Sequence, residues 1–254
     1  MVYYVAYKPP LGVDNRRQIE DQLRTLGGKQ IRGFLWAIGK QDLIAARHIL
    51  QKQMPVLLRR TREIRKPNPA NGNEQRELGS LIVIAYKATK DVKKEKVRNW
   101  LRRAPCLRLS PGVYAFPQRR IFDKKGRLVN AGGFWELVRQ FDEDAAIIPR
   151  LTVVNTKAVD RLVDETKKRV VKETAKIIEG YKTLYKRASQ DDIDGQRAVE
   201  MARKIRRRFY TVKKVAAIYG DWLKIDLGST VMKPYPAMRK VRQTLEEKYG
   251  ATRL

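Results

Sequence analysis

One short run of residues is nearly repeated in this chain. VYYVAYK at 2–8 and LIVIAYK at 81–87 consist of β-branched, aliphatic and aromatic residues, and both end in Ala-Tyr-Lys. A run of this kind is typical of a buried β-strand. Its recurrence predicts a duplicated module, which constrains the fold and the function together.

The first copy, over residues 1–66, predicts strands and helices in alternation. Prolines end the first strand, and a helix follows with Ile19, Leu23 and Leu26 at i, i+4 and i+7 on one face. IRGFLWAIG then predicts two short strands separated by Gly33. QDLIAARHILQKQ predicts a second helix and PVLLRRTREI a last strand, so the order is β-α-β-β-α-β.

The second copy, over residues 80–154, has the same order. Val97 and Leu101 have the separation of the first two apolar helix positions in copy one, and CLRLSPGVYAFPQ places Gly112 between two strands. FWELVRQFDED then predicts a helix and AAIIPRLTVVN a strand. The polar segment 67–79, rich in Pro, Gly and Asn, is expected to be the linker between the copies.

The β-α-β-β-α-β order is the ferredoxin-like arrangement, so we expect an α+β protein with two tandem ferredoxin-like units. Around Val5, Ile82 and Ile84 the strands are apolar at successive positions, which indicates that both of their faces are apolar. We therefore expect the units to form a pseudo-dimer, with two sheets packed face to face. Residues 155–218 predict a long antiparallel helical hairpin with a basic second helix. Residues 219–254 predict a tail with a strand-like KIDL and a terminal helix near 237–249.

The net charge of the chain points to a polyanionic partner. The sequence has 56 Lys and Arg against 27 Asp and Glu, giving a formal charge of +29. Nucleic acid is the commonest partner for such an excess, because neutralising phosphates releases counterions. A single cysteine, Cys106, excludes an internal disulfide and a cysteine-based zinc site. No window reaches the apolar length of a membrane span, so we expect a cytoplasmic protein, associated with the nucleoid or with ribonucleoprotein.

Basic side chains form the candidate nucleic-acid interface. They gather on the first helix of each copy, after the last strand of copy one, in a predicted hairpin near residue 120, and on the second long helix beside Tyr210. Arginine predominates in several of these clusters, which suits bidentate phosphate contacts. The candidates are Arg16, Arg17, Arg24, Arg59, Arg60, Arg62, Arg65, Lys66, Lys93, Lys94, Arg98, Arg102, Arg103, Arg119, Arg120, Lys124, Lys125, Arg127, Arg203, Lys204, Arg206, Arg207, Arg208 and Tyr210.

Residue types that support catalysis are sparse. His48 is the only histidine, on a predicted helix, and Cys106 begins a predicted strand. No P-loop or GxGxxG pattern is present. The sequence therefore gives no catalytic, cofactor-binding or metal-binding residue.

A pattern in the second copy resembles known regulator domains. The strand-helix-L-x-P-G-V-Y-x-x-P pattern, followed by a helical hairpin, is similar to the N-terminal domain of chromate-resistance regulators and to the C-terminal domain of phenylacetate-pathway repressors. The similarity covers about residues 80–225 and implies binding to DNA. The residues that carry the pattern are Leu109, Pro111, Gly112, Val113, Tyr114 and Pro117.

Each unit also resembles the small ferredoxin-like CRISPR-associated endonuclease fold, which works as a homodimer. That family has an acidic metal ligand at the end of the first strand. Here Tyr7-Lys8 and Tyr86-Lys87 stand at this place. A protonated lysine repels a divalent cation, so the resemblance supports the fold and argues against the nuclease.

We therefore predict a non-enzymatic nucleic-acid-binding protein without a cofactor, with DNA favoured over RNA and a transcription-regulatory or chromatin role. A structured-RNA or ribosome-associated protein is the alternative. A metal-dependent nuclease and a chromate-responsive regulator come third. The sequence leaves open whether the chain forms a homo-oligomer.

Overall fold

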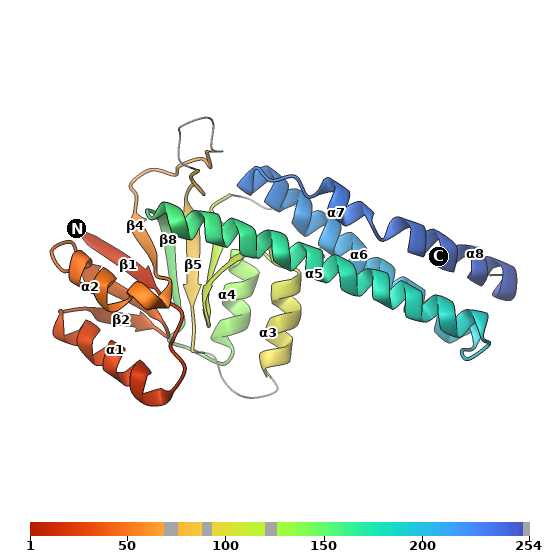
Figure 1. Ribbon diagram of the computed structural model, residues 1–254, viewed down its shortest axis with the longest axis horizontal. Coiled ribbons are helices and arrows are strands. Elements are labelled where there is room, and N and C mark those ends of the chain that lie inside the picture. Colours follow the sequence, from red (N-terminus) through yellow and green to blue (C-terminus); the bar gives the residue numbers. More distant parts are fainter. Residues whose placement is uncertain (69–75, 88–92, 120–125, 251–254) are drawn as a thin grey trace. The chain divides into compact units, whose positions relative to one another are not determined.

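The computed structural model describes residues 1–68, 76–87, 93–119 and 126–250, and for Lys93 and Lys94 it describes the backbone alone. The chain divides into two compact units, Met1–Asp164 and Glu165–Leu254. One helix, α5 (Thr156–Ser189), begins in the first unit and continues into the second (Figure 1).

The first unit contains the predicted order of strands and helices twice. The first half has β1 (Val2–Ala6), α1 (Val13–Thr25), β2 (Lys29–Arg32), β3 (Leu35–Gly39), α2 (Leu43–Ile49), a 3-10 turn (Gln51–Gln53) and β4 (Val56–Arg60). The second half has β5 (Leu81–Ala85), α3 (Lys93–Arg102), β6 (Leu107–Ser110), β7 (Val113–Pro117), α4 (Ala131–Arg139) and β8 (Ala146–Val153). The unit is therefore a mixed fold of helices and strands, as predicted.

The strands of both halves form one sheet. This sheet has eight antiparallel strands in the order β2-β3-β1-β4-β8-β5-β7-β6. The expectation of two separate sheets is therefore wrong. In separate sheets, β4 and β8 would each be an edge strand with unpaired backbone N–H and C=O groups. Here the two strands form hydrogen bonds with each other, with Leu58 opposite Val153 and Arg60 opposite Leu151. The middle of the sheet is consequently a junction between the halves (Figure 1).

One face of the sheet carries α1 to α4. In the first half, Val5, Trp36 and Leu57 pack in a cluster with buried residues of α1 and α2. In the second half, Ile84 and Phe116 pack in a cluster with buried residues of α3 and α4. The strand alternation and the pairing across β4 and β8 place both clusters on the same face.

The sheet curves so that its two halves meet across the opposite face. Arg32, at the end of β2, forms an ion pair with Asp142, which lies after α4, and a second one at 3.1 Å with Asp144. A Cβ atom on Gly33 would lie 3.3 Å from the carbonyl oxygen of Tyr86. Because helices occupy the outer face, this approach encloses the inner one. Its wholly buried residues are Ala6, Leu35, Val56, Leu58, Leu81, Val83, Ala85, Val113, Ala115 and Leu151.

The glycines that matched in the sequence occupy matching turns. Gly33 lies between β2 and β3 with φ of 55°, and Gly112 lies between β6 and β7 with φ of 76°. Both values fall in the left-handed region, which glycine adopts without a steric penalty. The two turns thus share one backbone requirement.

The second unit is helical. It comprises the remainder of α5, α6 (Gly195–Leu223), α7 (Gly228–Met232) and α8 (Tyr235–Tyr249). Asp194 caps α6 by accepting a hydrogen bond from the backbone N–H of Arg197 at 2.9 Å. Contacts between Arg169 and Tyr219, and between Glu173 and Arg208, show that α5 and α6 run antiparallel, as predicted.

Two details of the predicted tail are wrong. Helix α6 continues to Leu223, past residue 218, because Tyr219 and Trp222 belong to its buried face. KIDL is not a strand, since Lys224 takes a left-handed conformation that ends α6, and α7 begins at Gly228. No helix in the described part of the chain is long and apolar enough to cross a membrane.

Candidate nucleic-acid interface

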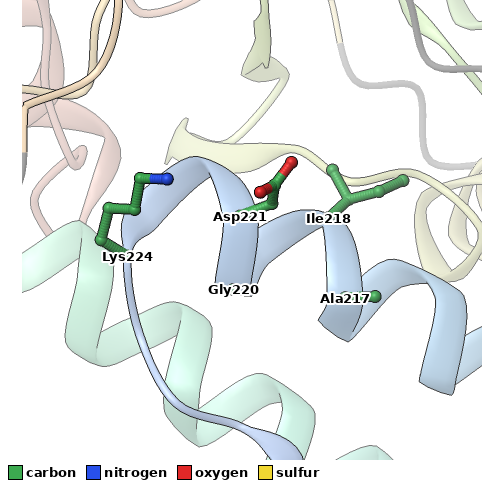
Figure 2. Close-up of a pocket in the computed structure, with 5 residues that line it drawn as sticks. All are labelled: Ala217, Ile218, Gly220, Asp221 and Lys224. Atoms are coloured by element: carbon green, nitrogen blue, oxygen red, sulfur yellow. The ribbon is translucent and has the colours of Figure 1, made fainter.

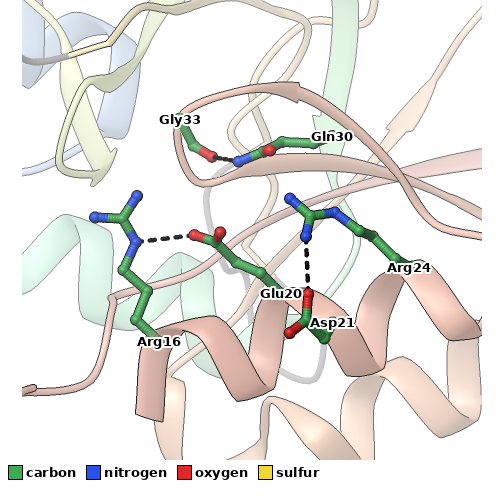
Figure 3. A network of polar contacts seen from close by, with 6 residues as sticks. All are labelled: Arg16, Glu20, Asp21, Arg24, Gln30 and Gly33. Atoms are coloured by element: carbon green, nitrogen blue, oxygen red, sulfur yellow. Dashed lines mark hydrogen bonds and ion pairs between the residues drawn. The ribbon is translucent and has the colours of Figure 1, made fainter. Parts of the chain in front are cut away.

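The arginines of α1 are largely engaged by acids of the same helix. Arg16 Nε donates to Glu20 at 2.8 Å, and Arg24 Nη1 donates to Asp21 at 2.8 Å (Figure 3). The Arg16 guanidinium also lies over the Phe34 ring, 4.6 Å from its centroid. Only Arg17 among the three is exposed with no ion pair in the described structure. This surface offers less free positive charge than its sequence indicates.

The basic residues on and after α3 have mixed roles. Arg98 is exposed, and Arg102 donates to the side chain of Asn99 at 3.0 Å. Arg103 donates to the backbone oxygens of Arg127 at 2.7 Å and Gly126 at 2.9 Å. Its guanidinium therefore holds the chain before α4. Arg119 is exposed, whereas Arg120, Lys124 and Lys125 lie outside the described residues.

The basic cluster after β4 gains a member from β8. Arg59 is partly buried, and Arg60, Arg62, Arg65 and Lys66 are exposed. Thr61 N–H donates to the backbone oxygen of Arg150 at 2.8 Å, and Arg150 Nη1 donates to the backbone oxygen of Arg62 at 3.2 Å. The β4–β8 junction thus places Arg150, which is remote in sequence, among these side chains.

The two ends of the connection from β4 to β5 pair with each other, and this pairing places Arg76 near the basic residues that follow β4. Arg65 and Ser80 exchange two hydrogen bonds, from Arg65 N–H to Ser80 Oγ at 2.8 Å and from Ser80 N–H to the Arg65 oxygen at 2.9 Å. Asn68 and Glu77 pair through their backbones at 3.0 and 2.9 Å. We call the resulting group the junction cluster. It consists of Arg59, Arg60, Arg62, Arg65, Lys66, Arg76 and Arg150.

Three members of the junction cluster line a pocket of about 240 Å³, here called the arginine pocket. Its Arg76 Nε is buried and has no hydrogen-bond partner. One carboxylate, that of Glu77, also lines the pocket. The full lining is Arg59, Arg65, Arg76, Glu77, Leu78, Gly79, Thr152, Val153, Val154, Thr156 and Val159. Positive charge therefore exceeds negative charge around this hollow.

The basic residues of α6 divide into engaged and exposed groups. Arg208 Nη2 donates to Glu173 Oε2 at 2.6 Å, so this arginine braces α5 against α6. Burial raises the pKa of the Glu173 carboxyl, but hydrogen bonds from Lys176 and Arg208 outweigh it and lower that pKa overall. The Arg206 guanidinium lies 5.5 Å from the centre of the Tyr210 ring. The exposed residues with no ion pair in the described structure are Arg203, Lys204 and Arg207.

A wider pocket in the second unit lacks an excess of cations. It has a volume of about 520 Å³ and is lined by Ala217, Ile218, Gly220, Asp221 and Lys224 (Figure 2). Its single carboxylate and single ammonium carry opposite charges. This pocket therefore gives less reason to expect a phosphate than the arginine pocket does.

The described residues contain no group of three or more His, Cys, Asp and Glu side chains placed to hold a metal ion. His48 is exposed on α2, and Cys106 is buried. Asp142 accepts hydrogen bonds from Arg32 and from the Lys87 N–H at 2.6 Å. Its carboxylate is thus engaged by donors of the fold.

Sequence reasoning missed Arg76 and Arg150. Arg76 stands alone in the polar segment 67–79, and Arg150 stands alone within β8. Neither has basic neighbours in the sequence. Only the strand pairing and the fold-back of the β4–β5 connection bring them to the other arginines.

Comparison of the chain with protein-family models, curated proteins and solved structures found no match. Its function is therefore argued from the geometry of its own residues.

Proposed function

We propose that this chain is a non-enzymatic nucleic-acid-binding protein that grips phosphates with the junction cluster. Its first candidate ligand is duplex DNA, with a transcription-regulatory role, because of the resemblance to regulator domains. The observation that carries the proposal is that Arg59, Arg65 and Arg76 line one pocket where β4, the β4–β5 connection and β8 meet, with Arg150 of β8 bonded to the Arg62 backbone nearby. The acids in the same segments of the sequence are Glu63, Glu74 and Glu77, of which Glu74 lies outside the described residues.

The charge distribution supports a polyanion as the ligand. Residues 1–164 contain 33 Lys and Arg against 16 Asp and Glu, and residues 165–254 contain 23 against 11. Both units thus attract phosphates over distances of about 8–10 Å at moderate ionic strength. Six of the seven cluster residues are arginines, which can form bidentate contacts with phosphate oxygens.

The two halves of the sheet support an origin by duplication of one ferredoxin-like unit, which we include in the proposal. The strand order from β4 outward, β4-β1-β3-β2, is repeated as β8-β5-β7-β6. The matching turns at Gly33 and Gly112 also support an origin by duplication. Duplication would explain why the junction forms between equivalent strands, and hence why cations of both halves meet there.

A salt series on the full chain tests the proposal. The change is the triple variant Arg60→Gln, Arg62→Gln and Lys66→Gln, which leaves the arginine pocket intact. If these residues contact phosphates, the slope of log K against log salt should become shallower by about 2 to 3, because each contact contributes about 0.9. Fluorescence anisotropy with labelled duplex DNA measures this slope.

A matched control removes the same charge from arginines that are ion-paired. The control is Arg16→Gln, Arg24→Gln and Arg242→Gln, whose partners are Glu20, Asp21 and Glu246. We expect a clearly smaller change in slope. Equal effects of the two triple variants would mean that only the overall charge matters, and the junction cluster would lose its role.

A second variant asks whether α6 also contacts the ligand. Arg203→Gln, Lys204→Gln and Arg207→Gln should weaken binding to all sequences alike, because phosphate contacts carry no base information. Unchanged affinity would remove α6 from the interface. The same titration with structured RNA decides the ligand class, since tighter binding to RNA would overturn the preference for DNA.

The non-enzymatic part of the proposal has its own test. Labelled DNA and RNA incubated with the protein and Mg²⁺ or Mn²⁺ should stay intact. Metal-dependent cleavage that persists through purification, and that tracks the protein rather than a contaminating fraction, would overturn it.

A further inference from the structure

We propose that the arginine pocket binds the terminal phosphate monoester of a nucleic-acid strand, so that the protein recognises strand ends. This inference rests on the proposed function and adds a ligand group to it. Its basis is a hollow lined by Arg59 of β4 and by Arg65 and Arg76 of the β4–β5 connection.

The pocket contains an unmet hydrogen-bond donor. Arg76 Nε is buried without a partner, although buried donors are nearly always paired in folded proteins. A phosphate oxygen in the pocket would supply an acceptor. The guanidinium groups of Arg59 and Arg65, which line the same hollow, provide further donors around it.

The walls of the pocket are fixed by backbone contacts. Gly79 has φ of 69°, and a Cβ atom there would lie 2.7 Å from Pro67 N and 2.8 Å from the Arg65 oxygen. The chain therefore closes on itself only with glycine at this position, and this closure pairs Arg65 with Ser80 and Asn68 with Glu77, so that Arg65 and Arg76 line the same pocket. Thr152 Oγ1 donates to the Arg59 backbone oxygen at 3.3 Å, which ties the β8 wall to β4.

The start of α5 adds partial positive charge. Thr156, its first residue, and Val159, one turn later, line the pocket. Asn155 anchors this end of the helix, because its side chain accepts from Leu57 N–H at 2.9 Å and donates to the Pro55 oxygen at 2.9 Å. The N-terminal end of a helix favours anions.

Size and charge favour a monoester over the diesters within a strand. The pocket, at about 240 Å³, is smaller than the roughly 300–1,000 Å³ of sites that enclose drug-sized ligands. A terminal phosphate has one substituent and can enter such a hollow end-on, whereas an internal diester has two. A monoester also carries a charge of about −1.5 to −2 at neutral pH, against −1 for a diester. Glu77 lowers the positive excess but leaves it at three arginines to one carboxylate.

The test compares one oligonucleotide with and without a 5′-phosphate, using the full chain. We expect the phosphorylated form to bind about tenfold more tightly or better, as one additional charge-assisted contact allows. Arg76→Gln should abolish this preference, so that the two forms bind with equal affinity, and it should weaken binding of the 5′-hydroxyl form only as far as the loss of one junction-cluster cation does. Arg76→Lys keeps the positive charge but loses the planar guanidinium that can donate two parallel hydrogen bonds. This variant should therefore keep only part of the wild-type preference for the 5′-phosphate.

Each outcome decides one of the two proposals. Equal binding of both oligonucleotides by the wild type would overturn the terminal-phosphate site but leave the proposed function standing. No binding of either would overturn the proposed function. Inorganic phosphate and a nucleoside 5′-monophosphate are each added as competitors of the phosphorylated oligonucleotide. If both remove the preference at the same concentration, the pocket is a site for free phosphate, and strand-end recognition is overturned. If the folded Arg76→Gln variant still prefers the 5′-phosphorylated oligonucleotide, the arginine pocket is not the site that binds the terminal phosphate.

Discussion

The contact between Arg32 and Asp142 predicts how the two halves of the sheet are held together. The Asp142 side chain is 3% exposed, and it accepts hydrogen bonds from Arg32 Nε at 3.0 Å, from Arg32 Nη2, and from Lys87 N–H at 2.6 Å. We therefore choose Asp142→Ala as the perturbation. It removes all three acceptor contacts at once.

The expected loss of stability is about 2–4 kcal/mol. Leaving the Lys87 N–H without its partner costs about 1–3 kcal/mol, and breaking a buried ion pair costs about 3–5 kcal/mol. The expected loss is smaller than the sum of these two costs, because the Arg32 side chain is 26% exposed and keeps Asp144 at 3.1 Å. Asp144→Ala is the matched control, since its carboxylate is 78% exposed and should contribute little.

The assay is urea unfolding followed by far-ultraviolet circular dichroism, repeated at several pH values. Burial raises the pKa of Asp142, but the hydrogen bonds from Arg32 and Lys87 outweigh it and hold that pKa below its ordinary 3.8. The wild type should keep this stabilisation at pH well above 3.8 and lose it as the pH falls through the lowered pKa. The difference between wild type and Asp142→Ala should therefore shrink in acid. Equal losses for Asp142→Ala and Asp144→Ala at pH 7 would refute the reasoning.

Three further perturbations probe the packing. Gly79→Ala should destabilise the chain by about 1–3 kcal/mol in thermal melts, since its φ is 69° and the new Cβ meets backbone at 2.7 Å; an unchanged melt would mean that this connection relaxes freely. Glu173→Gln should cost about 1 kcal/mol through its bond to Arg208, and the loss should fade below pH 4.5, because the carboxyl pKa is lowered from that value. Burial raises the pKa of both Tyr7 and Tyr181 to about 12, so an ultraviolet titration should show them un-ionised when exposed tyrosines titrate near 10; complete titration near pH 10 in the folded state would contradict this.

The local elements could be predicted because their signals are local. The strand runs and the apolar helix positions Ile19 and Leu23 give the correct element order. The joining of the two sheets could not be predicted in this way. The strands Val56–Arg60 and Ala146–Val153 are compatible with separate sheets or with one, because periodicity records which residues are buried and not which strand edge meets which.

The candidate site shows the same limit. The acids that engage Arg16 and Arg24 lie four residues after and three residues before them, so helix spacing in the sequence already contained this information. The pairing of Arg208 with Glu173, 35 residues apart, depends on how α5 and α6 pack. Cations that are close in sequence are thus a mixture of free and engaged groups.

The asymmetry of the arginine pocket leads to a prediction of stoichiometry. A duplicated sheet could carry two equivalent sites, but the halves differ in the segments that come after their last strands. After β4 the chain forms the connection that contains Arg65 and Arg76, whereas after β8 it enters α5 at Thr156. The pocket uses both of these segments, so the described chain can form this combination only once. Titration calorimetry with a 5′-phosphorylated oligonucleotide too short to span two proteins should give one tight site per chain, lost in Arg76→Gln. Two equal sites would place terminal-phosphate binding in features common to both halves, such as the turns at Gly33 and Gly112, instead of at the junction.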